Sequence, residues 1–276
     1  MLLITGATGN VGHELVLILH AAGKHVRALT RGERPHWLPE DVEVAAGDLD
    51  RPESLAGALT GVAGVFLLPG YRDMPGLLAA IRDAGASNVV QLSGGSAASG
   101  DMSNAITAYM VRSETAVQES GLPWTILRPT AFMSNTLRWA PQLAAGDVVS
   151  APFADVRTAT IDPHDVAAVA AQALQEDGHD GRVYQPTGPD SLLPADQIQV
   201  LAEVLARDLR FEGQTNDEAR QEMSKSTPPE YVDAFFDFYV AGSLDESHAT
   251  TTVEDVTGHP PRSFEQWATA HAEAFR

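Results

Sequence analysis

Cysteine is absent from this chain of 276 residues. Its absence excludes disulfide bonds, thiolate nucleophiles and zinc or iron–sulfur centres held by cysteine. Long apolar runs are absent as well, because no stretch reaches the roughly 20 consecutive apolar residues that a membrane-spanning helix needs. We therefore expect no membrane partner. The first residues lack the basic lead and cleavable apolar segment of a secretory signal, so we expect a cytoplasmic protein.

Positive charge is scarce. The chain has 18 Lys and Arg against 37 Asp and Glu, which gives a formal charge of −19. Nucleic-acid binding depends on a basic face that neutralises phosphates, so we expect no nucleic-acid partner. Only two of the basic residues are lysines, Lys24 and Lys225. The 44% of hydrophobic residues is ordinary for a globular protein, and the length suits one large domain or two closely packed ones.

Short apolar runs alternate with amphipathic stretches along the first half of the chain. The alternation of strand and helix predicts an α/β fold with a parallel sheet covered by helices on both faces, the doubly wound class. We expect residues 1–130 to form this core and residues 131–276 a smaller C-terminal α/β portion. The predicted strands are residues 2–4, 26–29, 42–45, 65–68, 89–92 and 124–127, and the predicted helices are 11–19, 52–59, 76–84 and 108–120.

The alternation becomes irregular in the second half of the chain. Residues 158–174 predict a short strand followed by a helix, with Asp162 as the cap and Pro163 at the first helical position. A helix is also predicted at 196–207, and another closes the chain at 263–275.

Three glycines form the strongest local signal. They lie between the first strand and the first helix, where glycine allows a tight turn and lets the backbone approach a pyrophosphate, while the helix N-terminus offers amides to the anion. This placement predicts a dinucleotide site of the Rossmann kind, although three glycines can also simply make a turn. The expected contacts in the turn are Gly6, Thr8, Gly9, Asn10, Val11 and Gly12.

The end of the second strand indicates which dinucleotide is bound. An acid there favours NAD, whereas an arginine accommodates a 2′-phosphate. Arg31 follows the strand directly, so NADPH is favoured, while Glu33 counts against this preference. The alternative is that Arg31 and Arg34 are solvated loop charges.

The ends of the next three strands supply further candidate contacts. Asp48 can accept a hydrogen bond from an adenine amino group, or it can instead cap the helix ahead of Pro52. The expected contacts at these strand ends are Asp48, Leu49, Leu68, Pro69 and Ser93, the last under the nicotinamide.

The sequence resembles the NmrA-like branch of the atypical short-chain dehydrogenases. The resemblance is carried by the glycine turn, the strand 26–31, Gly47 to Leu49 and the run 113–135, and it extends over nearly the whole chain. It implies a nicotinamide cofactor and a place among NADPH-dependent reductases of quinones and triphenylmethane dyes, or among regulators that only sense the dinucleotide. It also implies that Arg128, Pro129, Thr130 and Phe132 flank the nicotinamide side of the cleft.

One residue pattern departs from the wider superfamily, in which a Tyr with a Lys four residues later donates a proton. Here Tyr109 is followed at that spacing by Ser113, and neither lysine lies nearby. A Tyr without a cationic neighbour keeps a pKa near roughly 10 and is a poor acid at neutral pH. Tyr109 is therefore a weak candidate for the catalytic acid, and the alternative is an aromatic residue that lines the cleft or the helix surface.

An apolar pocket is expected beyond the sixth strand. Phe132 and Asn135 follow that strand at the edge where doubly wound sheets place ligands. The helix that carries Phe235 and Tyr239 is the expected cover, although aromatic residues at helical spacing are more often core. Phe132, Asn135 and Phe235 are thus the expected substrate contacts.

These features together predict an NADPH-dependent oxidoreductase of a quinone-like or conjugated aromatic small molecule. Such an acceptor gains conjugation when it takes a hydride, so positioning can suffice while solvent supplies the proton. The alternative is a non-catalytic regulator that senses NADP and binds a partner protein. The nine histidines show no metal-binding spacing, so no metal is expected, and the chain is expected to be a monomer or a homodimer.

Overall fold

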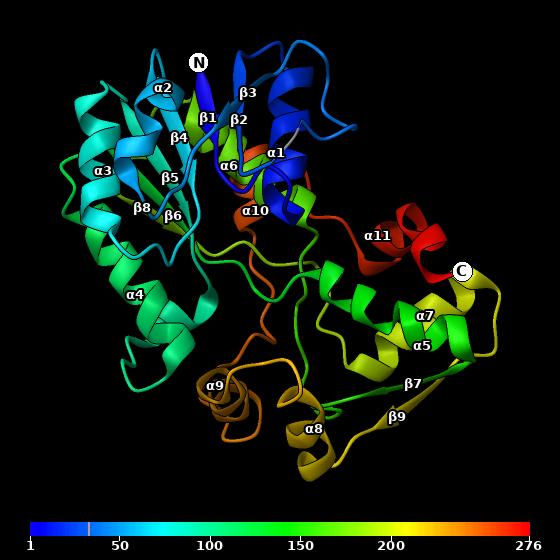
Figure 1. The fold of residues 1–276 in the computed structure, drawn as a ribbon. Coiled ribbons are helices and arrows are strands. Elements are labelled where there is room, and N and C mark those ends of the chain that lie inside the picture. The colour runs from blue at the N-terminus through cyan, green and yellow to red at the C-terminus, as the bar shows by residue number, and fades with distance from the viewer. Residues whose placement is uncertain (33) are drawn as a thin grey trace. The chain divides into compact units, whose positions relative to one another are not determined.

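A computed structural model describes residues 1–32 and 34–276 (Figure 1). Glu33, which counted against NADPH, lies outside the described residues. The chain forms two compact units, and the expected boundary at residue 130 lies close to one of the passages between them. The first unit comprises Met1–Gly100, Thr107–Arg128 and Pro163–Gln185, and the second comprises Asp101–Ile106, Pro129–Asp162 and Pro186–Arg276. A single boundary therefore leaves out the return of chain to the first unit at Pro163.

The first unit is built on a seven-stranded parallel sheet in the order β3-β2-β1-β4-β5-β6-β8. Strand order reverses between β1 and β4, which is the switch point where doubly wound sheets bind ligands. This architecture confirms the predicted α/β fold class. The strands are β1 (Leu2–Ile4), β2 (Val26–Thr30), β3 (Glu43–Ala46), β4 (Gly64–Leu67), β5 (Asn88–Leu92), β6 (Trp124–Leu127) and β8 (Arg182–Tyr184).

Helices cover both faces of this sheet, so the central strands are apolar on both sides. Leu3 and Val65 belong to the core on one face, together with side chains of α2, α3 and α4. Figure 1 shows α1 and α6 together on the opposite face, where His164 Nδ1 lies 3.0 Å from Glu14 Oε2. The helices are α1 (Asn10–Ala21), η1 (Pro52–Leu55), α2 (Ala56–Leu59), α3 (Met74–Asp83), η2 (Gly95–Ser99), α4 (Ala105–Gln118) and α6 (Pro163–Gln175).

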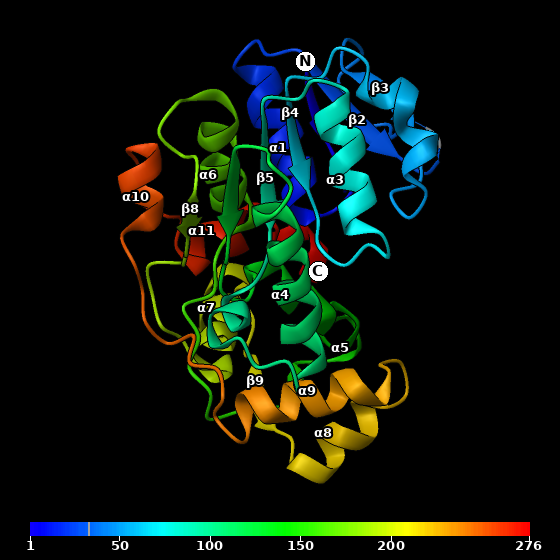
Figure 2. The same ribbon diagram turned by 90° about the vertical axis from the view of Figure 1, so that its left-hand side faces the viewer.

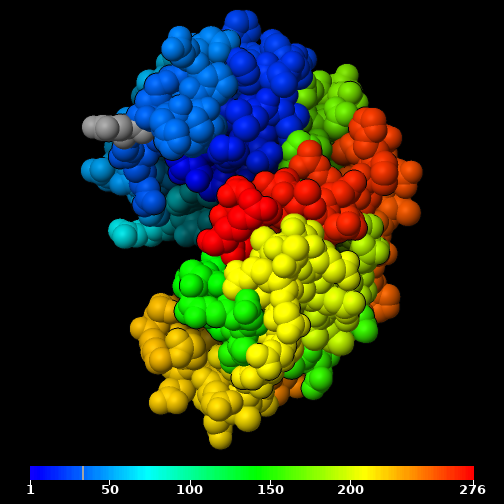
Figure 3. All heavy atoms as spheres, turned by 90° about the vertical axis from the view of Figure 1, so that its right-hand side faces the viewer, coloured from blue at the N-terminus to red at the C-terminus, as the bar shows by residue number. Residues whose placement is uncertain are grey.

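The second unit is mainly helical, with one parallel pair of strands, β7 and β9. Figure 3 shows α11 and η4 (red) against α7 and β9 (yellow), and Figure 2 shows α8 beside α9. Trp139, Trp267 and Phe264 lie in its main core. Its elements are η3 (Met133–Trp139), α5 (Ala140–Ala145), β7 (Val148–Ala151), α7 (Pro194–Leu205), β9 (Arg210–Gly213), α8 (Asn216–Met223), α9 (Pro229–Tyr239), α10 (Thr252–Thr257), α11 (Phe264–Ala270) and η4 (Ala272–Phe275).

Two predicted elements of the second half were wrong in detail. The closing helix begins after Ser263, whose side chain accepts a hydrogen bond from the Gln266 amide, but it breaks at His271, where the ring Nδ1 bonds the Trp267 carbonyl. The strand expected at 158–161 is replaced by isolated bridges, because Thr158 pairs with Leu192 on one side and Ile161 pairs with Phe132 on the other. In the described part of the chain, no helix combines the length and apolar character needed to cross a bilayer.

Candidate functional site

The glycine turn has a shape that only glycine permits at two of its positions. Gly6 has a φ of +60°, and a Cβ on Gly12 would lie 2.2 Å from the Gly6 carbonyl oxygen. The Gly9 amide donates to that same oxygen at 2.8 Å and Gly9 caps α1 in extended conformation. Thr8, Gly9 and Asn10 are exposed. The turn therefore presents an open helix N-terminus with no side chain in the way, which fits a dinucleotide pyrophosphate.

The ends of β1 and β4 are tied together beside this turn. The Leu68 amide donates to Thr5 Oγ1 at 3.2 Å, and the Leu68 side chain fills the space over Gly6, within 2.5 Å of a Cβ placed there. Leu68 thus contacts the turn, and its predicted contact with the cofactor stays a prediction. Leu49 instead packs against the hydrophobic core of the first unit, with part of its side chain still accessible.

Arg31 and Arg34 differ in what they contact. The Arg34 guanidinium donates to the backbone carbonyls of Pro39 and Val42 and holds the loop after β2. The exposed Arg31 guanidinium makes no hydrogen bond or ion pair with residues 1–32 or 34–276. Arg31 remains available for an anion, whereas Arg34 serves the loop.

Asp48 is engaged in its own loop. Its carboxylate accepts from Arg51 Nε at 2.9 Å and from the Asp50 amide at 3.0 Å, and these bonds lower its pKa below the usual range. It holds the loop ahead of Pro52 and does not cap the helix there, because no side chain caps η1. Tyr71 stands in the electrostatic field of Arg31, and burial raises its pKa to about 12. No sequence pattern indicated a role for Tyr71.

Ser93 and Arg128 both bind Glu114 on α4. Ser93 Oγ donates to Glu114 Oε1 at 2.5 Å, and Arg128 donates from Nε to Oε1 at 2.9 Å and from its terminal nitrogen to Oε2 at 2.5 Å. The Glu114 side chain is 5% exposed. This forked contact raises the pKa of Arg128 and joins the ends of β5 and β6 to α4. The polar atoms predicted to face nicotinamide are thus bonded inside the first unit.

Tyr109 lies against the loop that follows β4. Its ring is 3.4 Å from a Cβ placed on Gly70, and Ser113 Oγ accepts from the Gly70 amide at 2.9 Å while donating to the Tyr109 carbonyl at 2.8 Å. Ser113 is 2% exposed. The position that carries lysine in ordinary short-chain dehydrogenases therefore holds a buried loop anchor here.

A cavity of about 800 Å³ lies within the second unit. Phe132, Asn135 and Phe235, the three expected substrate contacts, all line it. The aromatic residues of α9 lie in two environments. Phe236 packs against Val232 in a small core, and Phe235 lines the cavity. The two interpretations of the aromatic pattern, pocket wall and core, thus apply to different residues of one helix.

The short helix η3 supplies one wall of this cavity. In a 3₁₀ helix, side chains three residues apart lie on the same face. Asn135 and Arg138 have this spacing, and Phe132 precedes them by the same step at the helix cap; all three line the cavity. Arg138 was not among the predicted site residues, although its spacing of three from Asn135 and six from Phe132 would indicate it on a 3₁₀ helix.

A tyrosine and a glutamate form a hydrogen-bonded pair beside the cavity. Tyr239 lines the cavity, and its hydroxyl donates to Glu246 Oε2 at 3.2 Å. Glu246 is 7% exposed, and burial raises its pKa to about 7, against the opposing hydrogen bonds from Tyr239 and the Ala131 amide. Burial also raises the pKa of Tyr239. The pair can therefore hold a proton near neutral pH. No sequence pattern indicated a role for Glu246.

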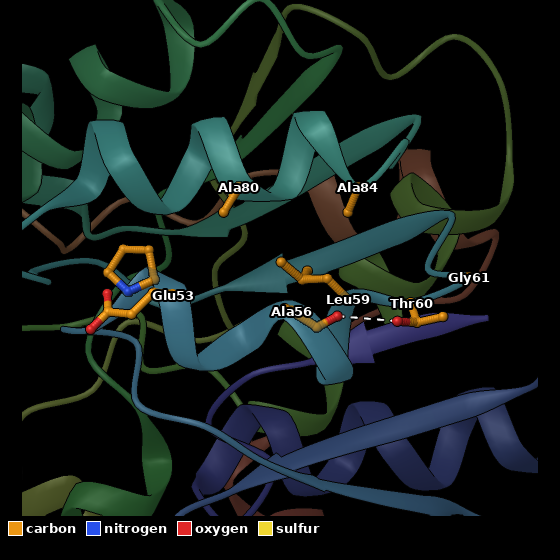
Figure 4. A pocket seen from close by; sticks show the side chains of 8 residues that line it. Glu53, Ala56, Leu59, Thr60, Gly61, Ala80 and Ala84 are labelled. Atoms are coloured by element: carbon orange, nitrogen blue, oxygen red, sulfur yellow. Dashed lines mark hydrogen bonds between the residues drawn. The ribbon is translucent and has the colours of Figure 1, made fainter.

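A second hollow, of about 550 Å³, lies on the first unit between α2 and α3 (Figure 4). Its walls are mostly small side chains, with Glu53 at one end and Thr60 bonded to the Ala56 carbonyl at 3.1 Å. It contains none of the predicted site residues. Among the described residues, no group of three or more His, Asp and Glu side chains is arranged to hold a metal ion.

The glycine turn and its sheet are matched by a family model. The model describes NAD(P)H-binding proteins and covers residues 6–177, from the first glycine of the turn to the end of α6. The chain belongs to this NAD(P)H-binding family. Membership confirms the predicted family resemblance and makes a nicotinamide dinucleotide the cofactor class of the turn.

Two relatives extend over the whole chain. A (4-alkanoyl-5-oxo-2,5-dihydrofuran-3-yl)methyl phosphate reductase of Streptomyces griseus is 40% identical over 282 residues, which cover 100% of this chain and 99% of the relative. An NAD(P)H azoreductase of Xenophilus azovorans is 35% identical over 290 residues, with 100% and 99% covered. The NADPH-dependent quinone oxidoreductase of Escherichia coli, solved with NADPH, has a TM-score of 0.80 at 21% identity, covers 99% of this chain and 100% of its own, and shows the same fold.

Proposed function

We propose that this protein is an NADPH-dependent reductase of flat, conjugated small molecules of the quinone class. The observation that carries the proposal is the cavity of the second unit, whose walls combine aromatic rings with many polar side chains, in a chain whose first unit carries the family's dinucleotide turn. Pockets of this size and character bind small organic ligands. The names of the two relatives, a reductase of an unsaturated lactone and an azoreductase, support a conjugated acceptor.

The first unit would hold the cofactor. The amides of Asn10 and Val11 at the start of α1 would bind the pyrophosphate, and the guanidinium of Arg31 would bind the 2′-phosphate that distinguishes NADPH. Bound NADPH supplies the hydride. Because Ser93 and Arg128 are bonded to Glu114, their side chains act as supports of the strand ends rather than as ligands of the cofactor.

The second unit would hold the acceptor. Phe132 and Phe235 offer flat apolar surfaces to a ring system, and Asn135 offers an amide to its polar substituents. Tyr239, hydrogen-bonded to Glu246, places a hydroxyl on the same wall, where it can hydrogen-bond a polar substituent of the acceptor; because burial raises the pKa of Tyr239, solvent rather than this hydroxyl supplies the proton.

Steady-state kinetics with calorimetry tests the proposal. NADPH oxidation is followed against a panel of quinones and an azo dye, and NADPH affinity is titrated in parallel on the same preparations. Phe132→Ala and Phe235→Ala are each expected to raise KM for the acceptor several-fold, while the Kd for NADPH stays within about twofold, since both residues line the cavity of the second unit.

The parallel titration separates the proposal from a purely sensing role. An NADPH complex that reduces no member of the panel would overturn the reductase assignment and favour a regulator. Equal losses of NADPH affinity and acceptor use in the two Phe variants would contradict the division of roles between the units.

A further inference from the structure

One wall of the cavity of the second unit carries a cation, Arg138. Arg138 lines the cavity and makes no hydrogen bond or ion pair with any described residue. Of the described lining residues, the other charged one is Glu222, whose carboxylate accepts from Lys225.

The surroundings of Arg138 favour the binding of an anionic partner. Arg138 is exposed on the cavity wall, and the protein atoms around it partly desolvate the guanidinium and lower its pKa, with Tyr239 acting in the opposite direction. An arginine nonetheless keeps its charge at neutral pH. A desolvated charge is stabilised by a partner of opposite sign, and interactions at such a site are weakened less by salt than those at an open surface.

The neighbours of Arg138 on η3 define what the partner looks like. Asn135 lies one 3₁₀ turn before it on the same face, and Phe132 lies one step earlier, so a ring, an amide and a guanidinium follow one another along the wall. A planar guanidinium suits carboxylate, sulfonate and phosphate groups because it can donate two parallel hydrogen bonds. The spacing fits a flat ring that carries an anionic substituent.

We propose that Asn135 and Arg138 bind an anionic substituent, a carboxylate, sulfonate or phosphate, on a flat acceptor whose ring lies against Phe132. That the ring is the group reduced rests on the proposed function; that the cavity selects anions does not. The anion pairs Arg138, the amide of Asn135 adds a second donor, and the apolar remainder of the wall holds the ring.

Calorimetry with two unreactive probes tests the charge preference without any redox chemistry. Naphthalene-2-sulfonate and naphthalene-2-sulfonamide share a ring and differ in charge, and each is titrated into the full-length chain. The sulfonate is expected to bind about 10-fold or more tightly than the sulfonamide, and Arg138→Met is expected to remove about 10- to 100-fold of its affinity, the scale of a hydrogen bond to a charged group. Binding of the sulfonamide should stay within about twofold.

Matched variants separate contact from general charge. Arg210→Met makes the same charge change at an exposed position on β9, outside the cavity lining, and is expected to leave both affinities unchanged. Arg138→Gln keeps a polar side chain and serves if the Met variant unfolds, as monitored by circular dichroism; Asn135→Ala should weaken the sulfonate by a smaller factor.

Each outcome decides the matter. Equal binding of the two probes by the unaltered protein, or a preference that survives loss of Arg138, overturns the anion site. If Arg210→Met reduces the preference for the sulfonate as much as Arg138→Met does, the preference comes from the net charge of the protein. That result also overturns the anion site. A charge preference in a protein that reduces no quinone keeps the anion site and refutes the reductase, whereas quinone reduction without charge preference does the reverse.

Discussion

Replacing Glu246 with Gln should stabilise this protein at alkaline pH and leave it nearly unchanged at acidic pH. Glu246 is 7% exposed, and its carboxyl accepts hydrogen bonds from Tyr239 and from the Ala131 amide. Burial raises its pKa from 4.5 to about 7 in the folded chain. Gln has the same shape as protonated Glu, so the variant mimics the form that the folded protein prefers.

The sign and size of the effect follow from linkage between proton binding and folding. Below the unfolded pKa both states carry the proton, and the full stability is present. As pH rises, the unfolded state loses its proton first, so the folded state loses stability until its own pKa of about 7 is passed. At about 1.4 kcal/mol per pH unit, the interval from 4.5 to about 7 corresponds to roughly 3 kcal/mol. Roughly 2 kcal/mol of this falls above about pH 5.5, away from the pI of about 4.7.

Urea unfolding of both proteins at several pH values measures the effect, read as the difference between the Gln variant and the unaltered chain. That difference should grow by roughly 2 kcal/mol between about pH 5.5 and about pH 8.5, because the titrations of all other groups cancel. Glu212→Gln, an exposed carboxyl on β9, is the control and should show a flat difference. Parallel stability curves for Glu246→Gln would refute the buried, proton-binding carboxyl.

The remaining predictions concern the first unit. Gly9→Asp should weaken NADPH binding at least 10-fold more than the isosteric Gly9→Asn, because only the former sets a negative charge at the pyrophosphate, and equal losses in calorimetry would contradict an anion site there. Arg31→Ala should reduce the preference for NADPH over NADH by about 1 to 3 kcal/mol in competitive titrations. Arg34→Ala should leave this preference unchanged and destabilise the loop after β2, since Arg34 binds backbone carbonyls of that loop. Tyr109→Phe should keep most quinone reduction, and a loss of the 10²- to 10⁴-fold typical of a removed general acid would show that Tyr109 is that acid.

The architecture of the first unit was predictable because its signals are local. The strands at 2–4 and 124–127 match β1 and β6 residue for residue, since short buried strands of a parallel sheet appear as apolar runs between turns. Gly6 and Gly12 were recognisable for a related reason: a positive φ and a near contact with backbone leave glycine as the residue that fits.

The second unit was less predictable because its structure depends on distant partners. Whether Thr158 joins a strand depends on where Leu192 lies, and whether the last helix continues depends on the His271 ring and the Trp267 carbonyl. The properties of Arg138 and Glu246 depend on the protein around them, since Arg138 lines a cavity and Glu246 is buried, and no neighbouring residue in the sequence indicates either location. Their chemistry follows from the surroundings rather than from a motif.

The contacts of Arg128 suggest a role other than the cofactor contact that the family resemblance implies. Arg128 makes a forked contact with the buried Glu114, so Arg128→Met would leave the Glu114 carboxylate without its charge partner. Removal of one partner of a buried pair lowers the free energy of unfolding by about 3 to 5 kcal/mol. The double change Arg128→Met with Glu114→Met should cost much less than the single one, because no unpaired charge remains. A direct cofactor ligand would behave differently: NADPH affinity would fall in both proteins and stability would hardly change. Unfolding free energies and NADPH titrations of the single and double variants therefore distinguish a support from a ligand, and an undiminished stability of Arg128→Met would refute the supporting role.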